Sequence, residues 1–212
     1  MCFSARVSAL TYAIGMVGTI ALWHHGFQPE AVFYGVVIQM QLIEFILWKT
    51  QPDCGRLNHA ATLLGMVVNH LEPIALYLAL IYFSRPLPIW VHITMGVFVI
   101  VSIIYTATAM QQEEGTCTRV TPQSCPHLYW AWNTHPEHAR PYYIFFLICL
   151  VLLSLYGLGD HGRTNAVLLF VSFVVSHIIY GSSHSTGAMW CFAAAFGPVL
   201  LLLLCKPCHK MN

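Results

Sequence analysis

The sequence predicts an all-α protein: a bundle of seven transmembrane helices with one long polar loop. Of its 212 residues, 58% are hydrophobic and only 8% are charged, whereas about 25% of the residues of a soluble domain carry a charge. Apolar runs recur along the whole chain, and several approach the roughly 20 residues that a helix needs to cross the hydrocarbon core of a bilayer. We therefore expect a single transmembrane domain over residues 1–212, with the polar loop at 110–140.

Seven apolar segments are separated by turns that are polar or contain proline. They cover residues 5–23, 31–48, 60–83, 89–109, 141–158, 165–180 and 188–204. An odd number of spans places the two ends of the chain on opposite sides of the membrane. Pro73 and Pro198 occupy comparable places in the third and seventh spans, as do Glu44 and His177 in the second and sixth. This favours a repeat of three helices on either side of a linking fourth.

The charges of the loops do not decide the orientation, because lysine and arginine are divided almost evenly between the two sides. The long loop contains Cys117 and Cys125, and we predict a disulfide between them, which forms on an exported side. The N-terminus and this loop would then be extracytoplasmic and the C-terminus cytosolic. A metal site that includes His127 is the alternative for this loop. The net charge of +1, with no basic cluster, disfavours nucleic acid as a partner.

The stretch Asn69-His70-Leu71-Glu72-Pro73 places polar groups in the middle of the third span. Thr62, Gly65, Asn69 and Glu72 follow the spacing i, i+3, i+7 and i+10, which puts them on one face of a helix. His70 lies about 100° away around the helix axis. Ionisable groups at this depth are costly unless they face protein or water, and this makes them a functional-site hypothesis.

The second and sixth spans carry comparable stripes. Gln41, Glu44 and Trp48 form one, and His177, Tyr180 and His184 form the other. We expect Glu44, Asn69, Glu72 and His177 to line one shared polar cavity, with Gln41 and His70 as further candidates. The alternative for each of these residues is a hydrogen bond between helices with no ligand.

These stripes suggest three functions. The first is a transporter or channel for a small solute, an ion or a proton, with Glu44 and Glu72 as the coupling carboxyl groups. The second is a membrane-embedded metal-dependent hydrolase in which His70, His177 and His184 bind zinc. The third is a non-catalytic subunit of a membrane assembly that holds pigment or haem. His177 and His184 are two helical turns, about 10.5 Å, apart along the axis, which disfavours the zinc site.

Zinc and haem are therefore cofactors that the sequence allows but does not favour. Cys117, Cys125 and His127 match no standard zinc finger. The tail Cys205-Lys206-Pro207-Cys208-His209 has the C-x-x-C-H pattern of haem attachment, but almost no chain follows it to enclose a haem. The expected partners are the lipid bilayer and a small solute or ion, together with further copies of the chain or a larger membrane complex.

The opening Met1-Cys2-Phe3-Ser4-Ala5 and the stretch Gln41-Leu42-Ile43-Glu44-Phe45-Ile46-Leu47-Trp48 resemble an uncharacterised family of small polytopic membrane proteins. Members of this family occur in bacteria, algae and large DNA viruses and begin Met-Cys-Phe-Ser. The resemblance covers about the first quarter of the chain, and residues 187–192 extend it. It implies a polytopic membrane fold and no particular function. This chain has Glu72-Pro73 where the family pattern has Gln-Pro.

Overall fold

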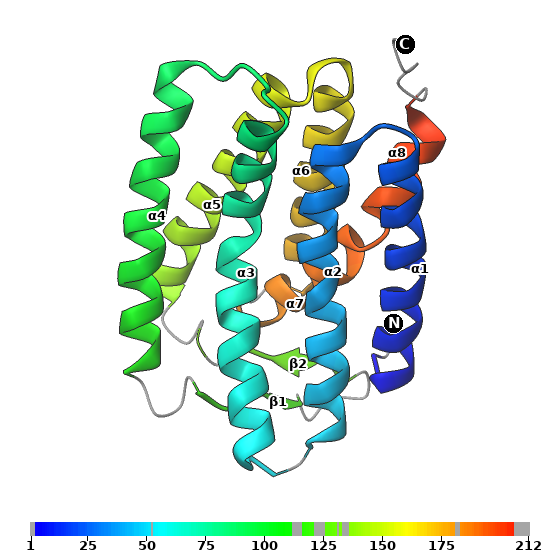
Figure 1. Ribbon diagram of the computed structural model, residues 1–212. Helices are drawn as coiled ribbons and strands as arrows, with labels where there is room; N and C mark the ends of the chain where they lie inside the picture. Colours follow the sequence, from blue (N-terminus) through cyan, green and yellow to red (C-terminus); the bar gives the residue numbers. More distant parts are fainter. Residues whose placement is uncertain are drawn as a thin grey trace.

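The computed structural model describes residues 3–51, 53–111, 116–120, 126–130, 132, 136–180 and 183–205. The predicted all-α bundle is confirmed (Figure 1). Its helices are α1 (Ala5–His24), α2 (Gln28–Lys49), α3 (Arg56–Tyr82), α4 (Ile89–Met110), α5 (Pro136–Gly157), α6 (Gly162–Tyr180), α7 (Ser183–Ala194) and α8 (Gly197–Leu204). A 3₁₀ turn, Gly159–His161, precedes α6, and two short strands, β1 (Arg119–Val120) and β2 (Leu128–Tyr129), lie between α4 and α5.

Six of these helices are long and apolar enough to cross a membrane alone. The seventh span is a bent pair, because α7 and α8 meet at an angle of 41°. Pro198 is at the start of α8. A backbone N–H at this position would have no helical carbonyl to bond, so proline, which lacks the N–H, is tolerated there. Gly18 of α1 lies so close to this break that an added Cβ would be 2.9 Å from the Cβ of Pro198. The seventh span is therefore broken next to its contact with α1.

Consecutive spans run in opposite directions, with α7 and α8 together as one span, and the strands cross one end of the bundle (Figure 1). The chain enters α1 at this hairpin end, where the backbone N–H of Phe3 donates to the carbonyl of Pro126 over 3.3 Å. It leaves α8 at the other end. The described spans therefore begin and end at opposite ends of the bundle, as an odd number of crossings requires.

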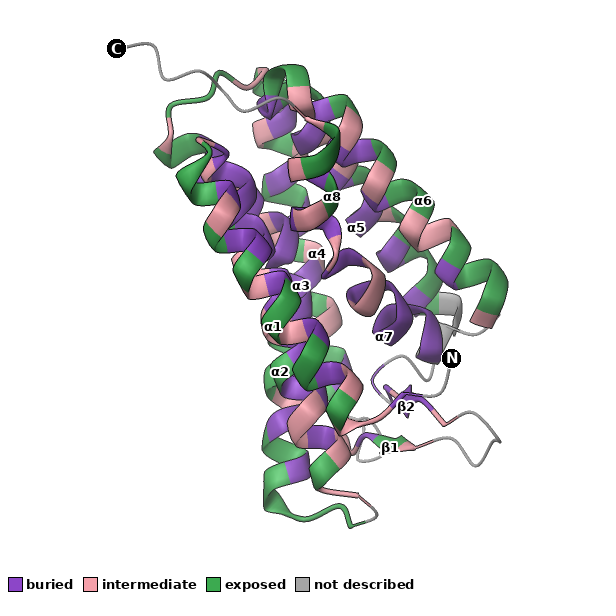
Figure 2. Ribbon diagram, turned by 90° about the vertical axis from the view of Figure 1, so that its right-hand side faces the viewer, coloured by how far each residue is buried: buried purple, intermediate pink, exposed green. Residues whose placement is uncertain are grey.

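The outer faces of the spanning helices are exposed (Figure 2), and many residues exposed on these helices have large apolar side chains. They include Val17, Leu78, Ile100, Ile103, Phe170 and Ile178. Soluble monomers rarely expose apolar surface over such an extent. The cations Arg6, Lys49, Arg56, Arg85, Arg140 and Arg163 are exposed near the helix ends instead. This distribution is that of a multi-pass integral membrane protein.

The described part of the long loop packs onto the bundle. Arg119 pairs with Tyr129 and Val120 with Leu128 in an antiparallel ladder. Next to this hairpin, Cys117 forms a disulfide with Cys54, their Cα atoms 5.8 Å apart. The predicted pairing of Cys117 with Cys125 is therefore wrong. The two loops lie at the same end of the bundle, so Cys54 meets Cys117 in space although the two are 63 positions apart in the sequence. Cys125 lies outside the described residues.

Candidate functional site

The polar stripe of α3 faces the interior, as its spacing predicted. Thr62, Asn69 and Glu72 are buried side chains, and Gly65 lies on the same buried face. Thr62 is held at the hairpin end, where its hydroxyl donates to Oγ1 of Thr118 over 2.9 Å. The stripe therefore leads from the hairpin into the middle of the bundle.

Asn69 joins three helices and the loop at this depth. Its Nδ2 donates to the hydroxyl of Tyr143 on α5 over 3.3 Å, and its Oδ1 lies 3.9 Å from Sγ of Cys191 on α7. The indole N–H of Trp132, from the long loop, donates to the same Tyr143 hydroxyl over 3.4 Å. Trp132 in turn stacks on Trp130, with ring centroids 4.7 Å apart. We call Asn69, Glu72, Tyr143 and Cys191 the polar centre.

Glu72 is the residue of the polar centre whose side chain is least satisfied. Its exposed fraction is 0%, and neither carboxyl oxygen has a hydrogen-bond partner among the described residues. Pro73 follows directly within the helix and has no N–H for the carbonyl of Asn69. A buried carboxyl group therefore lies beside a gap in the helical hydrogen bonding.

Gln41 and Glu44 form a second buried polar group on α2. Nε2 of Gln41 donates to Oε2 of Glu44 over 2.9 Å, while Oε1 of each residue has no partner in the part of the chain that is described. Like Glu72, Glu44 therefore has a carboxyl oxygen that is buried and without a partner among the described residues.

The two carboxyl groups are offset along the bundle. A Cβ added to Gly65 would lie 3.3 Å from Ile43 and 3.7 Å from Met40, so these residues share one level. Glu44 is close to this level, whereas Glu72 lies seven residues, about 10 Å, further along α3. The two carboxyl groups of the predicted shared cavity therefore lie at different depths in the bundle.

His70 points to the other side of α3. Its Nδ1 lies 2.7 Å from Oγ1 of Thr106 on α4. Its ring packs edge-on against Tyr105 and Tyr142, with centroids 5.4 and 5.0 Å away. The turn of 100° per residue thus separates His70 from its neighbour Asn69, and Nε2 of the imidazole lacks a partner in the described structure.

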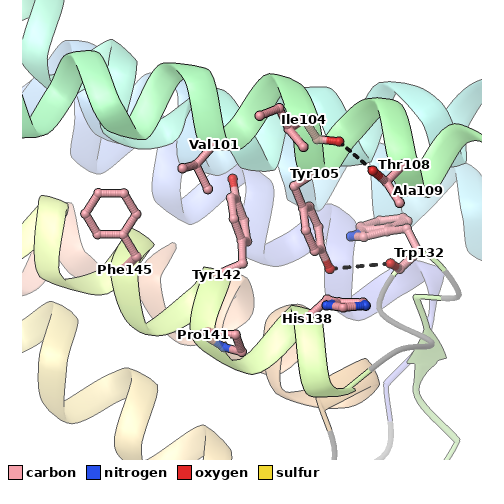
Figure 3. A pocket seen from close by; sticks show the side chains of 10 residues that line it. All are labelled: Val101, Ile104, Tyr105, Thr108, Ala109, Trp132, His138, Pro141, Tyr142 and Phe145. Atoms are coloured by element: carbon pink, nitrogen blue, oxygen red, sulfur yellow. Dashed lines mark hydrogen bonds between the residues drawn. The ribbon is translucent and has the colours of Figure 1, made fainter.

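Two cavities border α4 on this side. One, of about 330 Å³, lies between α3 and α4 and is lined in part by His70 and Thr106. The other, of about 480 Å³, lies between α4 and α5 (Figure 3). In it the rings of Tyr105 and Tyr142 stack at 4.2 Å, and the hydroxyl of Tyr105 donates to the carbonyl of Trp132 over 3.5 Å. The α4 side of α3 is thus aromatic and loosely packed.

The structure does not bring His177 to the polar centre. Its ring is on the surface of α6, with Nδ1 3.4 Å from Oγ1 of Thr186 on α7. It lines a separate cavity of about 220 Å³ together with Arg140 and Tyr143. Glu44, Asn69 and Glu72 are not among the residues that line this cavity. Tyr143 borders both places, because its hydroxyl accepts a hydrogen bond from Asn69 and the residue also lines the cavity.

A zinc site is not formed by the residues that the structure describes. They contain no group of three or more His, Cys, Asp or Glu side chains arranged to hold a metal ion. His70 and His177 do not meet, because His70 contacts Thr106 on α4 and His177 contacts Thr186 on α7. The side chain of His184 and the C-x-x-C-H tail from Lys206 onward lie outside the described residues.

Beyond the polar centre, a further buried polar chain crosses the bundle. The hydroxyl of Tyr34 on α2 donates to Oδ1 of Asn165 on α6 over 2.7 Å. Nδ2 of Asn165 donates to Oγ of Ser154 on α5 over 2.9 Å. Tyr34 is seven residues, about 10 Å, from Gln41 toward the end away from the hairpin. Buried polar groups are thus found on both sides of the level of Gln41.

Sequence reasoning missed several residues of the site. Tyr143 and Cys191 occur in apolar runs and show no polar periodicity, and Trp132 comes from the loop that we expected to be in water. Aromatic residues gathered in that loop were the available signal, since tryptophan is mostly buried when a bundle offers space.

Comparison with known proteins gives this site no relative. No model of a known protein family matches the chain. No curated protein and no solved structure matches it either.

Proposed function

We propose that the protein is a transporter or channel for a proton or a small cation, with the carboxyl group of Glu72 as its central binding group. The observation that carries this proposal is the complete burial of Glu72 with two oxygens that have no partner among the described residues. A carboxylate left alone in an apolar interior is strongly unfavourable. Binding a proton or a cation removes that cost, so the site has a reason to take up either one.

The positions of the other polar groups support passage along the bundle. Gln41 and Glu44 lie about 10 Å nearer the hairpin end than Glu72. Oxygen atoms without partners at two depths offer successive sites for a positive charge. A structural role would instead leave these oxygens hydrogen-bonded between helices, as it does for Tyr34 and Asn165.

Two helix irregularities support movement at the same depth. Pro73 interrupts α3 beside Glu72, and the seventh span is broken between α7 and α8. Small transporters commonly use interrupted helices near the midplane to bind ions and to change access. Trp130 and Trp132 cover the site from the hairpin end, since both are buried and Trp132 reaches the hydroxyl of Tyr143.

We further propose that the hairpin end faces the exported side of the membrane. The disulfide between Cys54 and Cys117 lies at that end, and disulfides persist in oxidising compartments. The C-terminus would then be cytosolic. Accessibility of tags at the two ends of the chain in intact cells tests this orientation, and an accessible C-terminal tag would contradict it.

The decisive experiment is a flux measurement in proteoliposomes under an imposed proton gradient, repeated with sodium and potassium gradients. Wild-type protein should dissipate at least one of these gradients, and Glu72→Gln should reduce that flux to the leak of empty vesicles. Asp160→Asn is the matched control, since Asp160 is an exposed carboxylate in the 3₁₀ turn before α6. Equal flux through wild type and Glu72→Gln would refute the role of Glu72.

A further inference from the structure

The cavity that contains His177 differs in chemistry from the polar centre. It lies between α5, α6 and α7 and is lined by Arg140, Tyr143, Ile144, Phe173, His177, Thr186, Gly187 and Trp190. Arg140 is exposed, and its guanidinium group forms no ion pair or hydrogen bond with any residue that the structure describes. Within the described part of the chain, no aspartate or glutamate lines the cavity. Among the described residues that line the cavity, Arg140 thus has no carboxylate to balance its charge.

In this cavity, α5 and α6 each place a polar side chain near the hairpin end and an apolar side chain one turn further into the bundle. Arg140 is near the start of α5 and His177 near the end of α6, so both lie close to the hairpin end of their spans. Ile144 follows Arg140 by four residues, and Phe173 precedes His177 by four residues. Each apolar side chain is therefore one turn, about 6 Å, deeper in the membrane than the polar one.

The groups around the cavity hold these side chains in place. Oγ1 of Thr186 lies 3.4 Å from Nδ1 of His177. When Nδ1 accepts this hydrogen bond, Nε2 carries the proton and is a donor. Trp190 is fixed by its indole N–H, which donates to Oγ of Ser172 over 3.1 Å, and its ring meets Phe173 edge-on at 6.0 Å. The hydrogen-bond donors Arg140 and His177 thus lie near the hairpin end of the cavity, and the aromatic rings of Phe173 and Trp190 line its deeper part.

We propose that this cavity binds an anionic phospholipid of the leaflet at the hairpin end. Its phosphate would receive hydrogen bonds from Arg140 and His177, and the beginning of its acyl chain would lie on Ile144 and Phe173. Arginine suits this role because its planar guanidinium group matches phosphate oxygens in pairs. Basic pockets between transmembrane helices bind the headgroups of anionic lipids in this way. Glu72 does not line this cavity, although Tyr143 borders both the cavity and the polar centre. The lipid proposal does not depend on the transport proposal.

Thermal melts of delipidated protein in detergent test the proposal. Dioctanoyl phosphatidylglycerol should raise the melting temperature saturably, whereas dioctanoyl phosphatidylcholine and inorganic phosphate should raise it much less. Arg140→Gln should weaken the binding of phosphatidylglycerol by about fivefold, the effect of one cation at a membrane surface. Arg163→Gln removes an exposed cation at the opposite end of α6 and should bind as tightly as wild type.

Phe173→Ala keeps every charge and should also weaken phosphatidylglycerol binding, since it removes part of the apolar wall. The melting temperature of each variant without lipid shows whether it is folded, and Arg140→Gln should match wild type because its side chain is exposed. Unchanged affinity in Arg140→Gln would overturn the proposal. An equal shift from inorganic phosphate alone, or from phosphatidylcholine, would overturn it as well.

Discussion

The two sides of α3 differ in how they treat buried polar groups. On one side, Asn69 is hydrogen-bonded and Glu72 is not, and both are completely buried among α2, α5 and α7. On the other side, His70 is bonded to Thr106 and enclosed by the rings of Tyr105 and Tyr142. Equal burial therefore does not mean equal role. Nδ1 of His70 has a partner on the neighbouring helix and only its Nε2 has none, whereas neither oxygen of Glu72 has a partner among the described residues.

The two sides of α3 also differ in packing density, and the side with the unsatisfied carboxyl group is the more closely packed one. The side of Glu72 is closely packed, with Gly65 against Ile43 and with the two tryptophans of the loop above it. The side of His70 borders cavities of about 330 and 480 Å³ along α4. A carboxyl group without hydrogen bonds would be expected in the loosely packed region, because water could enter there and bond to it. Glu72 lies in the closely packed region instead.

The largest difference should appear when the two ionisable residues are neutralised. Glu72→Gln should abolish flux, whereas His70→Gln should keep most of it, because His70 does not face the polar centre. Glu72→Gln removes no hydrogen bond of the described structure, so its melting temperature should not fall. Flux in proteoliposomes and melts in detergent measure both effects. Loss of flux in His70→Gln would place both sides of α3 on the transport path.

The next largest effect, on stability, should come from the disulfide between Cys54 and Cys117 at the hairpin end. The disulfide between Cys54 and Cys117 closes a loop with a sequence separation of 63, which corresponds to about 4 kcal/mol of stability on a chain-entropy argument. Cys54→Ser should therefore lower the melting temperature strongly. A reductant should lower that of wild type and leave the variant unchanged. Cys149→Ser is the control, because that thiol is free and buried. Mass spectrometry without reduction should find the peptide that joins Cys54 to Cys117.

Asn69→Ala should have a smaller effect than Glu72→Gln on flux. It removes the hydrogen bond to Tyr143, whose hydroxyl keeps that of Trp132. The loss should be about 1–3 kcal/mol of stability, with reduced but measurable flux. Asn69→Asp retains the size of the side chain and tests whether an added negative charge changes the preference among cations. Wild-type flux and stability in Asn69→Ala would exclude this residue from the centre.

The smallest effect should come from the side of His70. Thr106→Val leaves the shape of the side chain nearly unchanged and removes its hydrogen bond with Nδ1 of His70. The expected loss of stability is about 1 kcal/mol, and flux should be that of wild type. Thr94→Val is the matched control, because the hydroxyl of Thr94 bonds the carbonyl of Trp90 within α4. A fall in flux for Thr106→Val alone would contradict a structural role for His70.

The positions that the sequence predicted well are those governed by one helix at a time. The lengths of the apolar runs predicted the spans, because a helix must satisfy its own backbone in lipid. The spacing of Thr62, Gly65, Asn69 and Glu72 predicted one buried face, and it placed His70 on another, because 3.6 residues per turn fix these directions locally.

Only the tertiary structure decided which faces meet. His177 has a periodicity as good as that of Glu72, yet α6 turns it toward Arg140 and away from the polar centre. Cys117 joins Cys54 across two loops, and Tyr143, Cys191 and Trp132 reach Asn69 from three distant segments. The rotation and depth of each helix depend on close contacts such as those of Gly18 and Gly65. Such contacts join residues far apart in the chain, and no local period of the sequence encodes them.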